Sequence, residues 1–507
     1  MKIRALQICG TGSGVGKSVI VTALCRIFLQ DGYRVCPFKA QNMSLNSFVT
    51  SGGAEIGRAQ ATQALSCRIL PHADMNPVLL KPMTNVGSQV IVQGKPIGNR
   101  TARQYQQKKY KKQLFLKVKE SFNRLKKEYE LVVIEGAGSP AEINLKSHDI
   151  VNLKMAAYAQ APVILLADID QGGVFASLVG TLQLLDKKER RMVKGFIINK
   201  FRGDKSLLRD GLRFLERKTK KPVLGVIPYF KDITLPEEDS AVLDGRGKKP
   251  QQNDQVKRAI KISVIKLPHI SNFTDFDAFK KEPDISLDYI DQACHFNNPD
   301  LIIIPGTKNT IQDLIWLKNS GLAGKIIAAL DRKEPAVVAG ICGGYQMLGE
   351  RIYDAYAIES SKKKISGLGI FPTVTFLEKK KVLTQVKARE VSSGLEVSGY
   401  EIHHGRSCNL NGYRPAFKII ERAGKETEIF DGIVGGKENI LGTYIHGVFD
   451  ADNFRRDFLN RIRIKKGLAA LNNLKPANLE SEFDQLADLV RRNINLRLLY
   501  KILNAGI

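Results

Sequence analysis

A glycine-rich loop near the beginning of the chain restricts the folds that the chain can adopt. The loop, GTGSGVGKS at residues 10–18, follows the apolar stretch 5–9 and precedes the helix-patterned stretch 19–29. A strand, a glycine-rich turn and a helix in this order form a phosphate cradle, in which backbone N–H groups and the helix N-terminus point at phosphate oxygens. The sequence therefore predicts a parallel α/β sheet with a nucleotide site at its edge.

Each residue type in this loop has a role in binding a nucleotide and its metal. Gly12, Gly14 and Gly16 let the backbone curl around phosphate oxygens, Lys17 adds a positive charge for the β and γ phosphates, and the Ser18 hydroxyl is a Mg²⁺ ligand. Position 11 is threonine where the strict pattern GxxxxGK[ST] has glycine, so the loop is a variant that is one residue longer. We expect a nucleotide with β and γ phosphates and Mg²⁺ as the cofactors.

Charged residues at the ends of other predicted strands belong to the same edge of the sheet. Glu135 follows a buried strand and is our first candidate for a Mg²⁺ ligand, and Glu55 in GGAEIGRAQ is the second. Lys39 ends another strand and can hold a phosphate or a substrate carboxylate. Asp168 and Asp170 follow a further strand, and open α/β sheets bind ligands where their parallel strands end.

The alternation of short β-branched runs with amphipathic segments predicts two α/β domains. The first is expected over residues 1–235, and a polar segment rich in Gly, Pro and Gln forms a linker at 236–258. A second α/β pattern covers 259–460. The remaining segment, 461–507, has helical spacing with many charges, and we expect its helices to pack on the second domain.

A cysteine in the second domain lies in a turn typical of a catalytic nucleophile. AVVAGICGGYQMLG at 336–349 predicts a buried strand, a sharp turn that carries Cys342, and a helix. Small residues on both sides of the cysteine permit the strained turn, and the helix N-terminus supplies N–H groups that stabilise a thiolate. The PGT turn at 305–307 follows another strand and can complete an oxyanion hole.

A thiolate nucleophile requires a base, and three histidines are candidates. His446 ends the strand in GTYIHGVFD at 442–450, and a neighbouring strand of one sheet can bring it to Cys342. His403 and His404, in SGYEIHHGRS, compete for the role. We predict Cys342 and His446 as the catalytic pair.

The chain carries a strong positive charge. Lysine and arginine number 78 against 51 aspartate and glutamate residues, a formal net charge of +27, which favours an anionic partner. The basic clusters at 108–112, 187–191 and 362–364 are dispersed, and 7% of residues are aromatic, which disfavours a nucleic-acid surface. A polycarboxylate or polyphosphate substrate fits this charge, and so does a solvated basic surface.

No apolar stretch approaches the length of a membrane span. The stretches 161–167 and 301–304 fall far short of the roughly 20 residues that a span needs, and polar residues interrupt the first ten positions before any secretory signal can form. Seven cysteines without CxxC pairs predict reduced thiols. We therefore expect a cytoplasmic protein with no membrane partner.

Together these motifs resemble the cobyric acid synthase family. The matching stretches extend to about position 460, and QNMSLNS (41–47), INKFRGD (198–204) and GYEIHHGR (399–406) are the most particular. The others include EIGRAQATQA (55–64), EGAGSPAEINL (135–145), LPEEDS (235–240), HISNFTDFD (269–277), IPGTKNTIQDL (304–314) and GICGGYQMLG (340–349).

The resemblance implies an N-terminal dethiobiotin synthetase-like domain that binds MgATP and a C-terminal class I glutaminase-like domain. It implies ATP- and glutamine-dependent amidation of the b, d, e and g carboxylates of adenosylcobyrinic acid a,c-diamide, with the corrinoid and L-glutamine as substrates. It also implies that Asn199 contacts the adenine. Two positions depart from related patterns: Val448 stands where most triad glutaminases have glutamate, and Gln171 where DIDRGG has arginine.

Two alternative functions share these features. Cobyrinic acid a,c-diamide synthase has both domains, but QNMSLNS and INKFRGD favour the cobyric acid synthase branch. A non-catalytic P-loop switch of the partitioning-ATPase type would have a degenerate second domain, and Cys342 together with His446 argues against that hypothesis.

Overall fold

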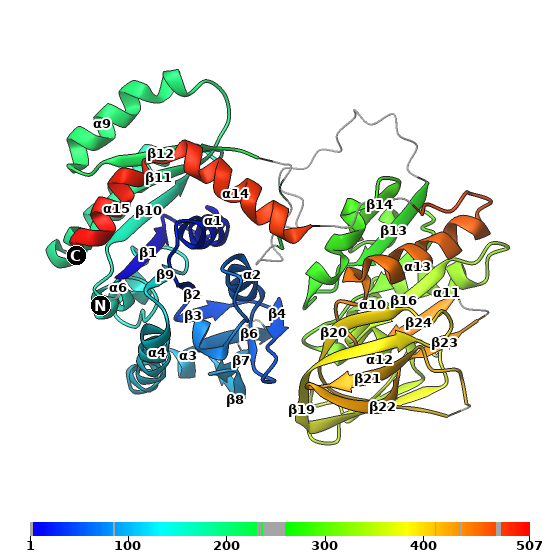
Figure 1. Cartoon of the computed structure of the whole chain (residues 1–507). Coiled ribbons are helices and arrows are strands. Elements are labelled where there is room, and N and C mark those ends of the chain that lie inside the picture. Colours follow the sequence, from blue (N-terminus) through cyan, green and yellow to red (C-terminus); the bar gives the residue numbers. More distant parts are fainter. Residues whose placement is uncertain are drawn as a thin grey trace.

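Two α/β units lie side by side in the computed structural model of the chain (Figure 1). The structure describes residues 4–84, 87–230, 233, 235–236, 259–410, 412–436, 439–472 and 478–507. The predicted linker at 236–258 lies outside the described residues apart from Pro236, and so does most of the LPEEDS stretch. The α/β class expected for both units is confirmed.

The first domain is built on a six-stranded parallel sheet in the order β12-β11-β10-β1-β9-β2. Helices cover both faces, which is why the strands are nearly continuous apolar runs. The strands are β1 (Arg4–Gly10), β2 (Val35–Phe38), β9 (Leu131–Glu135), β10 (Val163–Asp168), β11 (Val193–Phe201) and β12 (Val223–Pro228).

Alternate residues of β1 serve the two faces of this sheet. Leu6 and Ile8 pack with α1, whereas Ala5 belongs to the cluster under α4. The helices of the domain are α1 (Lys17–Gln30), α2 (Arg58–Ser66), α3 (Ala102–Tyr105), α4 (Lys108–Glu128), α5 (Ile143–Lys146), α6 (Leu153–Ala159), α7 (Val174–Leu184), α8 (Lys187–Met192) and α9 (Arg209–Thr219).

Two further small sheets extend the first domain and were not predicted from the sequence. They lie on the side that faces the second domain, near its strands β19 and β20 (Figure 1). One has the order β3-β6-β7-β8, and the other is the β4-β5 hairpin. Their strands are β3 (Gln41–Met43), β4 (Ser47–Val49), β5 (Glu55–Gly57), β6 (Val78–Thr84), β7 (Gly87–Val92) and β8 (Lys95–Thr101).

The second domain is also parallel at its centre, as predicted. Its main sheet has the order β14-β13-β15-β16-β24-β23, with β23 as an antiparallel edge strand. The strands are β13 (Ile260–Ile265), β14 (Ile285–Ile290), β15 (Leu301–Ile304), β16 (Val337–Ile341), β23 (Ile433–Gly435) and β24 (Ile440–Thr443). The helices are α10 (Thr310–Asn319), α11 (Leu322–Leu330), α12 (Gly343–Leu348) and α13 (Asp452–Lys465).

The part of the chain between α12 and β23 forms a second, largely antiparallel sheet. It contains the long β19-β20 hairpin, which reaches toward the first domain (Figure 1). Its strands are β17 (Arg351–Tyr353), β18 (Lys364–Ser366), β19 (Thr373–Glu390), β20 (Glu396–Asn409), β21 (Phe417–Arg422) and β22 (Lys425–Asp431).

The C-terminal helices correct one sequence prediction. Helix α13 packs on the second domain as expected, but α14 (Leu479–Asn493) and α15 (Leu496–Ala505) pack on the first (Figure 1). Their apolar faces join the core of Leu6 and Ile8, and buried Arg26 of α1 contacts Glu480 and Asp484, each at 2.7 Å. An amphipathic pattern reveals that a helix has an apolar face without revealing which surface covers it.

Replacing Leu486 with alanine should destabilise the first domain. The side chain is fully buried in the core that α14 shares with α1, so its truncation leaves a cavity that costs about 2–5 kcal/mol. Urea denaturation, followed by far-UV circular dichroism, measures the change in the free energy of unfolding. Asp488→Ala, at an exposed position of the same helix, is the control, and equal stability of the two variants would contradict this packing.

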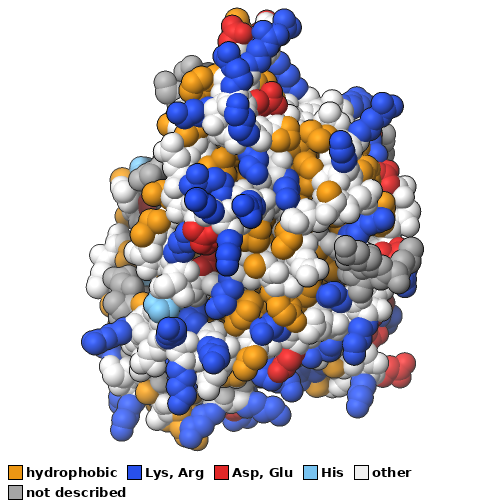
Figure 2. Space-filling model, turned by 90° about the vertical axis from the view of Figure 1, so that its left-hand side faces the viewer, with side chains coloured by type: hydrophobic (Ala, Val, Ile, Leu, Met, Phe, Trp, Pro, Cys, Tyr) orange, Lys and Arg blue, Asp and Glu red, His pale blue; other side chains and the backbone are white. Residues whose placement is uncertain are grey.

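Lysine and arginine side chains are spread over the face of the molecule in Figure 2 and do not gather in one stripe. All seven cysteines are free of disulfide bonds. Over the residues that the structure describes, helices long and apolar enough to cross a membrane are absent.

Candidate functional site

The glycine-rich loop lies at the carboxyl end of β1 and wraps around the Lys17 side chain. Gly14 and Gly16 adopt positive φ angles of 72° and 97°, which other residues rarely adopt. The Lys17 ammonium donates hydrogen bonds to the carbonyls of Gly12 at 2.8 Å and Gly138 at 3.2 Å. The predicted cradle is therefore curled, with its lysine inside it.

Three of the predicted residues meet at the end of β9. Glu135 is fully buried, and its carboxylate accepts hydrogen bonds from the Ser18 hydroxyl and the Lys39 ammonium, both at 2.9 Å. Gln63 of α2 donates a third bond, at 2.6 Å, and sequence reasoning missed this residue. A buried carboxylate beside a phosphate-loop hydroxyl is a donor set that Mg²⁺ accepts.

Asn199 lies against the same loop from β11. Its amide nitrogen donates to the carbonyl of Val15 at 2.9 Å, and a Cβ at Gly16 would approach that nitrogen to 2.3 Å. The other amide atom, Oδ1, is buried without a hydrogen-bond partner. Because buried polar atoms are normally paired, this oxygen is suited to accept from a bound group such as an amino group.

Glu55 does not join this cluster. Its carboxylate is fully buried at the domain interface, between Lys81 of the first domain at 2.8 Å and Lys381 of the second at 2.6 Å. Burial opposes its charge, but the two lysines hold the pKa of Glu55 below its usual range. The other acids predicted at the sheet edge are paired, Asp168 with Lys200 and Asp170 with Arg202.

Cys342 lies in the sharp turn between β16 and α12, with φ 52° and ψ −107°. Close backbone packing explains the glycines that follow it. A Cβ at Gly344 would lie 1.9 Å from the carbonyl oxygen of Ile304, and one at Gly343 would lie 2.8 Å from a methyl carbon of Thr307. The predicted elbow thus packs against the 305–307 turn, as expected if the two segments together form an oxyanion hole.

His446 follows β24, the neighbour of β16, and Cys342 is one of the groups that influence its charge. Its Nδ1 lies 2.6 Å from a carboxylate oxygen of Asp275. Burial alone lowers the pKa of a histidine, but the charge and hydrogen bond of Asp275, together with Cys342, raise the pKa of His446 to about 10. The imidazole is therefore protonated at neutral pH.

Asp275 supplies the carboxylate that the sequence pattern lacks at position 448. It lies in the short 3₁₀ segment Phe273–Lys281, and it is 171 residues away from His446 in the chain. Sequence reasoning missed its role, although the residue belongs to the HISNFTDFD stretch. Its place in a stretch that matches the family pattern could have marked it as a candidate. The neighbouring residues, however, do not indicate which histidine it contacts.

The two competing histidines have other partners. The His403 ring stacks on Tyr444 with 3.9 Å between centroids, and its Nδ1 lies 2.7 Å from the carbonyl of Gly405. His404 Nδ1 lies 3.0 Å from the carbonyl of Glu378. Burial, reinforced by the charges of nearby lysines, lowers the pKa of His404 to about 4, so this ring is neutral.

A small cavity of about 30 Å³ adjoins Cys342 at the domain interface. Of its charged residues, Lys308 is buried and Glu359 is partly buried. Loss of solvent raises the pKa of Glu359 to about 7, although Lys308 opposes the shift. The Glu359 carboxylate accepts from the backbone N–H of Thr310 at 2.6 Å. The other lining residues include Lys81, Ser271, Asn272, Thr307, Gln346, Lys381, Ile402, His403 and His404.

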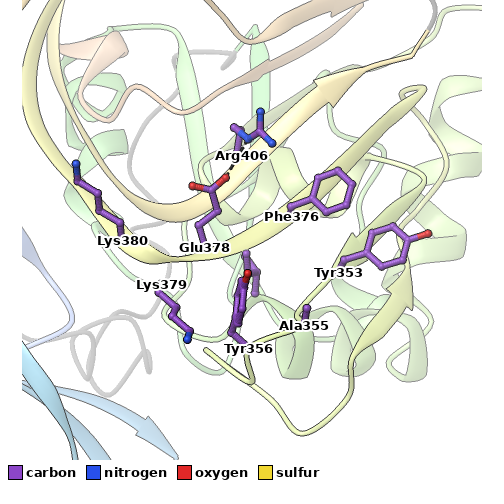
Figure 3. A pocket seen from close by; sticks show the side chains of 9 residues that line it. Tyr353, Ala355, Tyr356, Phe376, Glu378, Lys379, Lys380 and Arg406 are labelled. Carbon is purple, nitrogen blue, oxygen red and sulfur yellow. Dashed lines mark hydrogen bonds and ion pairs between the residues drawn. The ribbon is translucent and has the colours of Figure 1, made fainter.

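A larger cavity of about 430 Å³ opens on the surface of the second domain (Figure 3). Tyr353 and Phe376 stack along it, and Arg406 donates to Glu378 at 3.0 Å. Its other lining residues are Ala355, Tyr356, Leu377, Lys379 and Lys380. None of these is a predicted site residue, so we assign no step of the chemistry to this cavity.

Comparison with known proteins agrees with the two clusters. A model of the CobQ/CobB/MinD/ParA nucleotide binding domain matches residues 6–242, and a model of the CobB/CobQ-like glutamine amidotransferase domain matches 261–454. The chain is 49% identical to a cobyric acid synthase of Clostridium tetani, over 99% of both chains. It is 48% identical to that of Moorella thermoacetica, over 99% of this chain and 97% of the relative.

A thiol–imidazole–carboxylate set, a curled phosphate loop and this similarity along the whole chain lead to one conclusion. The chain is an enzyme of the glutamine amidotransferase class and belongs to the cobyric acid synthase family.

Proposed function

We propose that the enzyme uses ATP and glutamine to amidate the peripheral b, d, e and g carboxylates of adenosylcobyrinic acid a,c-diamide, giving adenosylcobyric acid. The observation that carries this proposal is the pairing of two sites in one chain. Cys342, His446 and Asp275 form a nitrogen-releasing site, and Lys17, Ser18 and Glu135 form a nucleotide site.

Glutamine hydrolysis in this proposal begins with Cys342 reacting as a thiolate beside the protonated imidazole of His446. The Cys342 thiolate attacks the side-chain amide carbon, and the oxyanion that forms accepts hydrogen bonds from backbone N–H groups of the elbow and the 305–307 turn. His446 donates its proton to the departing nitrogen as the C–N bond breaks, which releases NH₃ and leaves a glutamyl thioester. Water then attacks the thioester, and glutamate and the thiolate are released.

The residues that line the small cavity beside Cys342 are chemically suited to contact glutamine, although the cavity volume of about 30 Å³ is close to that of one water molecule and must widen for the substrate to enter. Free glutamine carries an ammonium and a carboxylate on its α-carbon, and the cavity offers Glu359 and Lys308 as complementary charges. The cavity is also lined by Lys81 of the nucleotide-binding domain, so it extends to the domain interface. Ammonia released there can leave toward the nucleotide site without entering bulk water, where it would be protonated.

The nucleotide site makes the substrate carboxylate reactive. A carboxylate resists attack because it is already anionic, so its oxygen first attacks the γ-phosphorus of ATP, which gives an acyl phosphate and ADP. Lys17 and the loop N–H groups stabilise the charge that develops on the transferred phosphoryl group. Ammonia then attacks the acyl carbon, phosphate leaves, and loss of a proton gives the amide.

The residues around Glu135 fit a Mg²⁺ ion that is bound mainly through phosphates. Groups of three or more His, Cys, Asp or Glu side chains that could hold a metal are absent from the described part of the chain. Mg²⁺ in phosphoryl-transfer sites needs only one or two protein ligands, and Ser18 and Glu135 would provide them. When bound, the ion neutralises charge on the nucleotide phosphates.

Supplying purified enzyme with glutamine, MgATP and the a,c-diamide corrinoid tests this function. We expect up to four additions of one amide each by mass spectrometry, with ADP, phosphate and glutamate formed in equal amounts. Offering cobyrinic acid in a parallel reaction distinguishes the sister activity. Amidation of cobyrinic acid but not of its diamide would contradict the proposal.

The Asp275→Asn variant should lose glutamine hydrolysis on the order of 10²- to 10⁴-fold. Without the carboxylate, only Cys342 still opposes the effect of burial on the pKa of His446, so the imidazolium form is lost at a lower pH. The alkaline limb of the pH–rate profile for glutamine hydrolysis should therefore shift downward. The control is Asp277→Asn in the same segment, where the carboxylate pairs with Lys280 at 2.5 Å; equal profiles for the two variants would refute the role of Asp275.

A further inference from the structure

The QNMSLNS stretch at 41–47 has no role in the mechanism above, yet it makes specific contacts across the domain interface. Its last two residues lie against the segment that precedes Asp275. The backbone N–H of Ser47 donates to the side-chain oxygen of Asn272 at 3.1 Å. The Thr274 hydroxyl donates to the side-chain oxygen of Asn46, also at 3.1 Å. All four residues are buried.

The same stretch also contacts a residue that packs on the histidine. The Tyr400 hydroxyl donates to the backbone carbonyl of Ser47 at 3.2 Å. Its ring stacks on the His446 imidazole, with 5.3 Å between centroids and 15° between planes. The two residues also pair through their backbones, with hydrogen bonds of 2.9 and 3.2 Å. Asp275 and Tyr400 are thus the two groups that orient His446, and the other domain holds both.

A third contact across the domain interface involves Asp450, which lies four residues after His446 in the chain. Arg58, the first residue of α2, lies 4.0 Å from the carboxylate of Asp450 and over the ring of Phe48, which follows Ser47. Asp450 donates its backbone N–H to Gly447, the residue next to His446. The nucleotide-binding domain therefore contacts the surroundings of His446 at three places: the 272–274 segment, Tyr400 and Asp450.

We propose that residues 46–47 of the nucleotide-binding domain are positioning residues for glutamine hydrolysis, because they hold Asp275 and Tyr400 against His446 across the domain interface. The proposal rests on the glutaminase activity proposed above. Hydrogen bonds of this kind fix an imidazole within the narrow range of orientations that proton transfer to the leaving nitrogen requires. The amidotransferase domain therefore reaches full activity only with the other domain seated on it.

Two conservative variants remove these contacts one at a time. Tyr400→Phe keeps the stacked ring and loses the hydroxyl that donates to Ser47, and Thr274→Val keeps the shape of the side chain and loses the donor to Asn46. We expect kcat for glutamine hydrolysis to fall about 3- to 10-fold in each variant, in line with one buried hydrogen bond. KM for glutamine should change less than twofold, because neither change touches Lys308 or Glu359.

Two matched controls separate positioning from general damage. Thr274→Ser retains a hydroxyl, and Tyr413→Phe makes the same chemical change at an exposed tyrosine of the second domain. Both should behave like the parent enzyme. Amidation driven by ammonium salts should be equal in all variants, because it bypasses the thiol.

The outcomes are distinct. Unchanged kcat in Tyr400→Phe and Thr274→Val would overturn the proposal, and so would equal losses with glutamine and ammonia, which indicate a structural defect. A parent enzyme that amidates with ammonia but does not hydrolyse glutamine would overturn the proposed function itself and the inference with it.

Discussion

Replacing Cys342 with alanine should abolish glutamine-driven amidation while leaving ammonia-driven amidation intact. The thiol is the nucleophile on the amide carbon, and its removal should lower the rate of glutamine hydrolysis by roughly 10⁴-fold or more. The nucleotide site is separate, and the only product of the glutaminase site that it needs is NH₃, which ammonium salts can supply. Amide formation, followed by mass spectrometry with glutamine or ammonium chloride as the nitrogen source, measures both activities.

The exposed Cys294 offers a matched control for this experiment. Cys294→Ala should behave like the parent with either nitrogen source. Equal loss of both activities in Cys342→Ala would refute the division of labour, and retained glutamine hydrolysis would show that another residue is the nucleophile.

Replacing Lys17 with alanine should remove amidation with either nitrogen source. This ammonium is the buried cation inside the phosphate loop, and loss of one such group at a transferred phosphoryl costs about 10²- to 10³-fold in rate. Glutamine hydrolysis, measured as glutamate released, should continue because Cys342 and His446 are untouched. The measurement is ADP formed in the presence of the corrinoid.

Lys108→Ala, at an exposed lysine at the start of α4, controls for the loss of one positive charge from the first domain. Near-normal amidation by Lys17→Ala would exclude the glycine-rich loop as the nucleotide site. A loss confined to glutamine-driven turnover would show instead that the variant disturbs the interface between the domains.

The sequence predicted those parts of the fold that depend on local patterns. Strands β13 and β15 coincide with the predicted segments 260–265 and 301–304, because strands covered on both faces are mostly apolar. The phosphate loop and the cysteine elbow were predictable for a related reason. Each needs glycine at positions where a side chain would collide or where φ is positive, as at Gly16 and Gly344.

The parts that escaped prediction depend on contacts between distant segments. Asp275 lies 171 residues from His446, so only the folded chain shows that this acid contacts the histidine. Glu55 shows the reverse case: its motif suggested a place beside Ser18 and Glu135, but the fold puts its carboxylate between Lys81 and Lys381 at the domain interface. Contacts between residues that are far apart in the chain leave no pattern in the sequence around either residue.

The return of α14 and α15 to the nucleotide-binding domain restricts how far the two domains can move relative to each other. The polypeptide leaves that domain, completes the amidotransferase domain and comes back, so two covalent tethers connect the halves. Twin tethers keep the effective concentration of each half near the other high and restrict the swivelling that a single hinge permits. A protease that cuts one tether would therefore leave a nicked but still assembled enzyme.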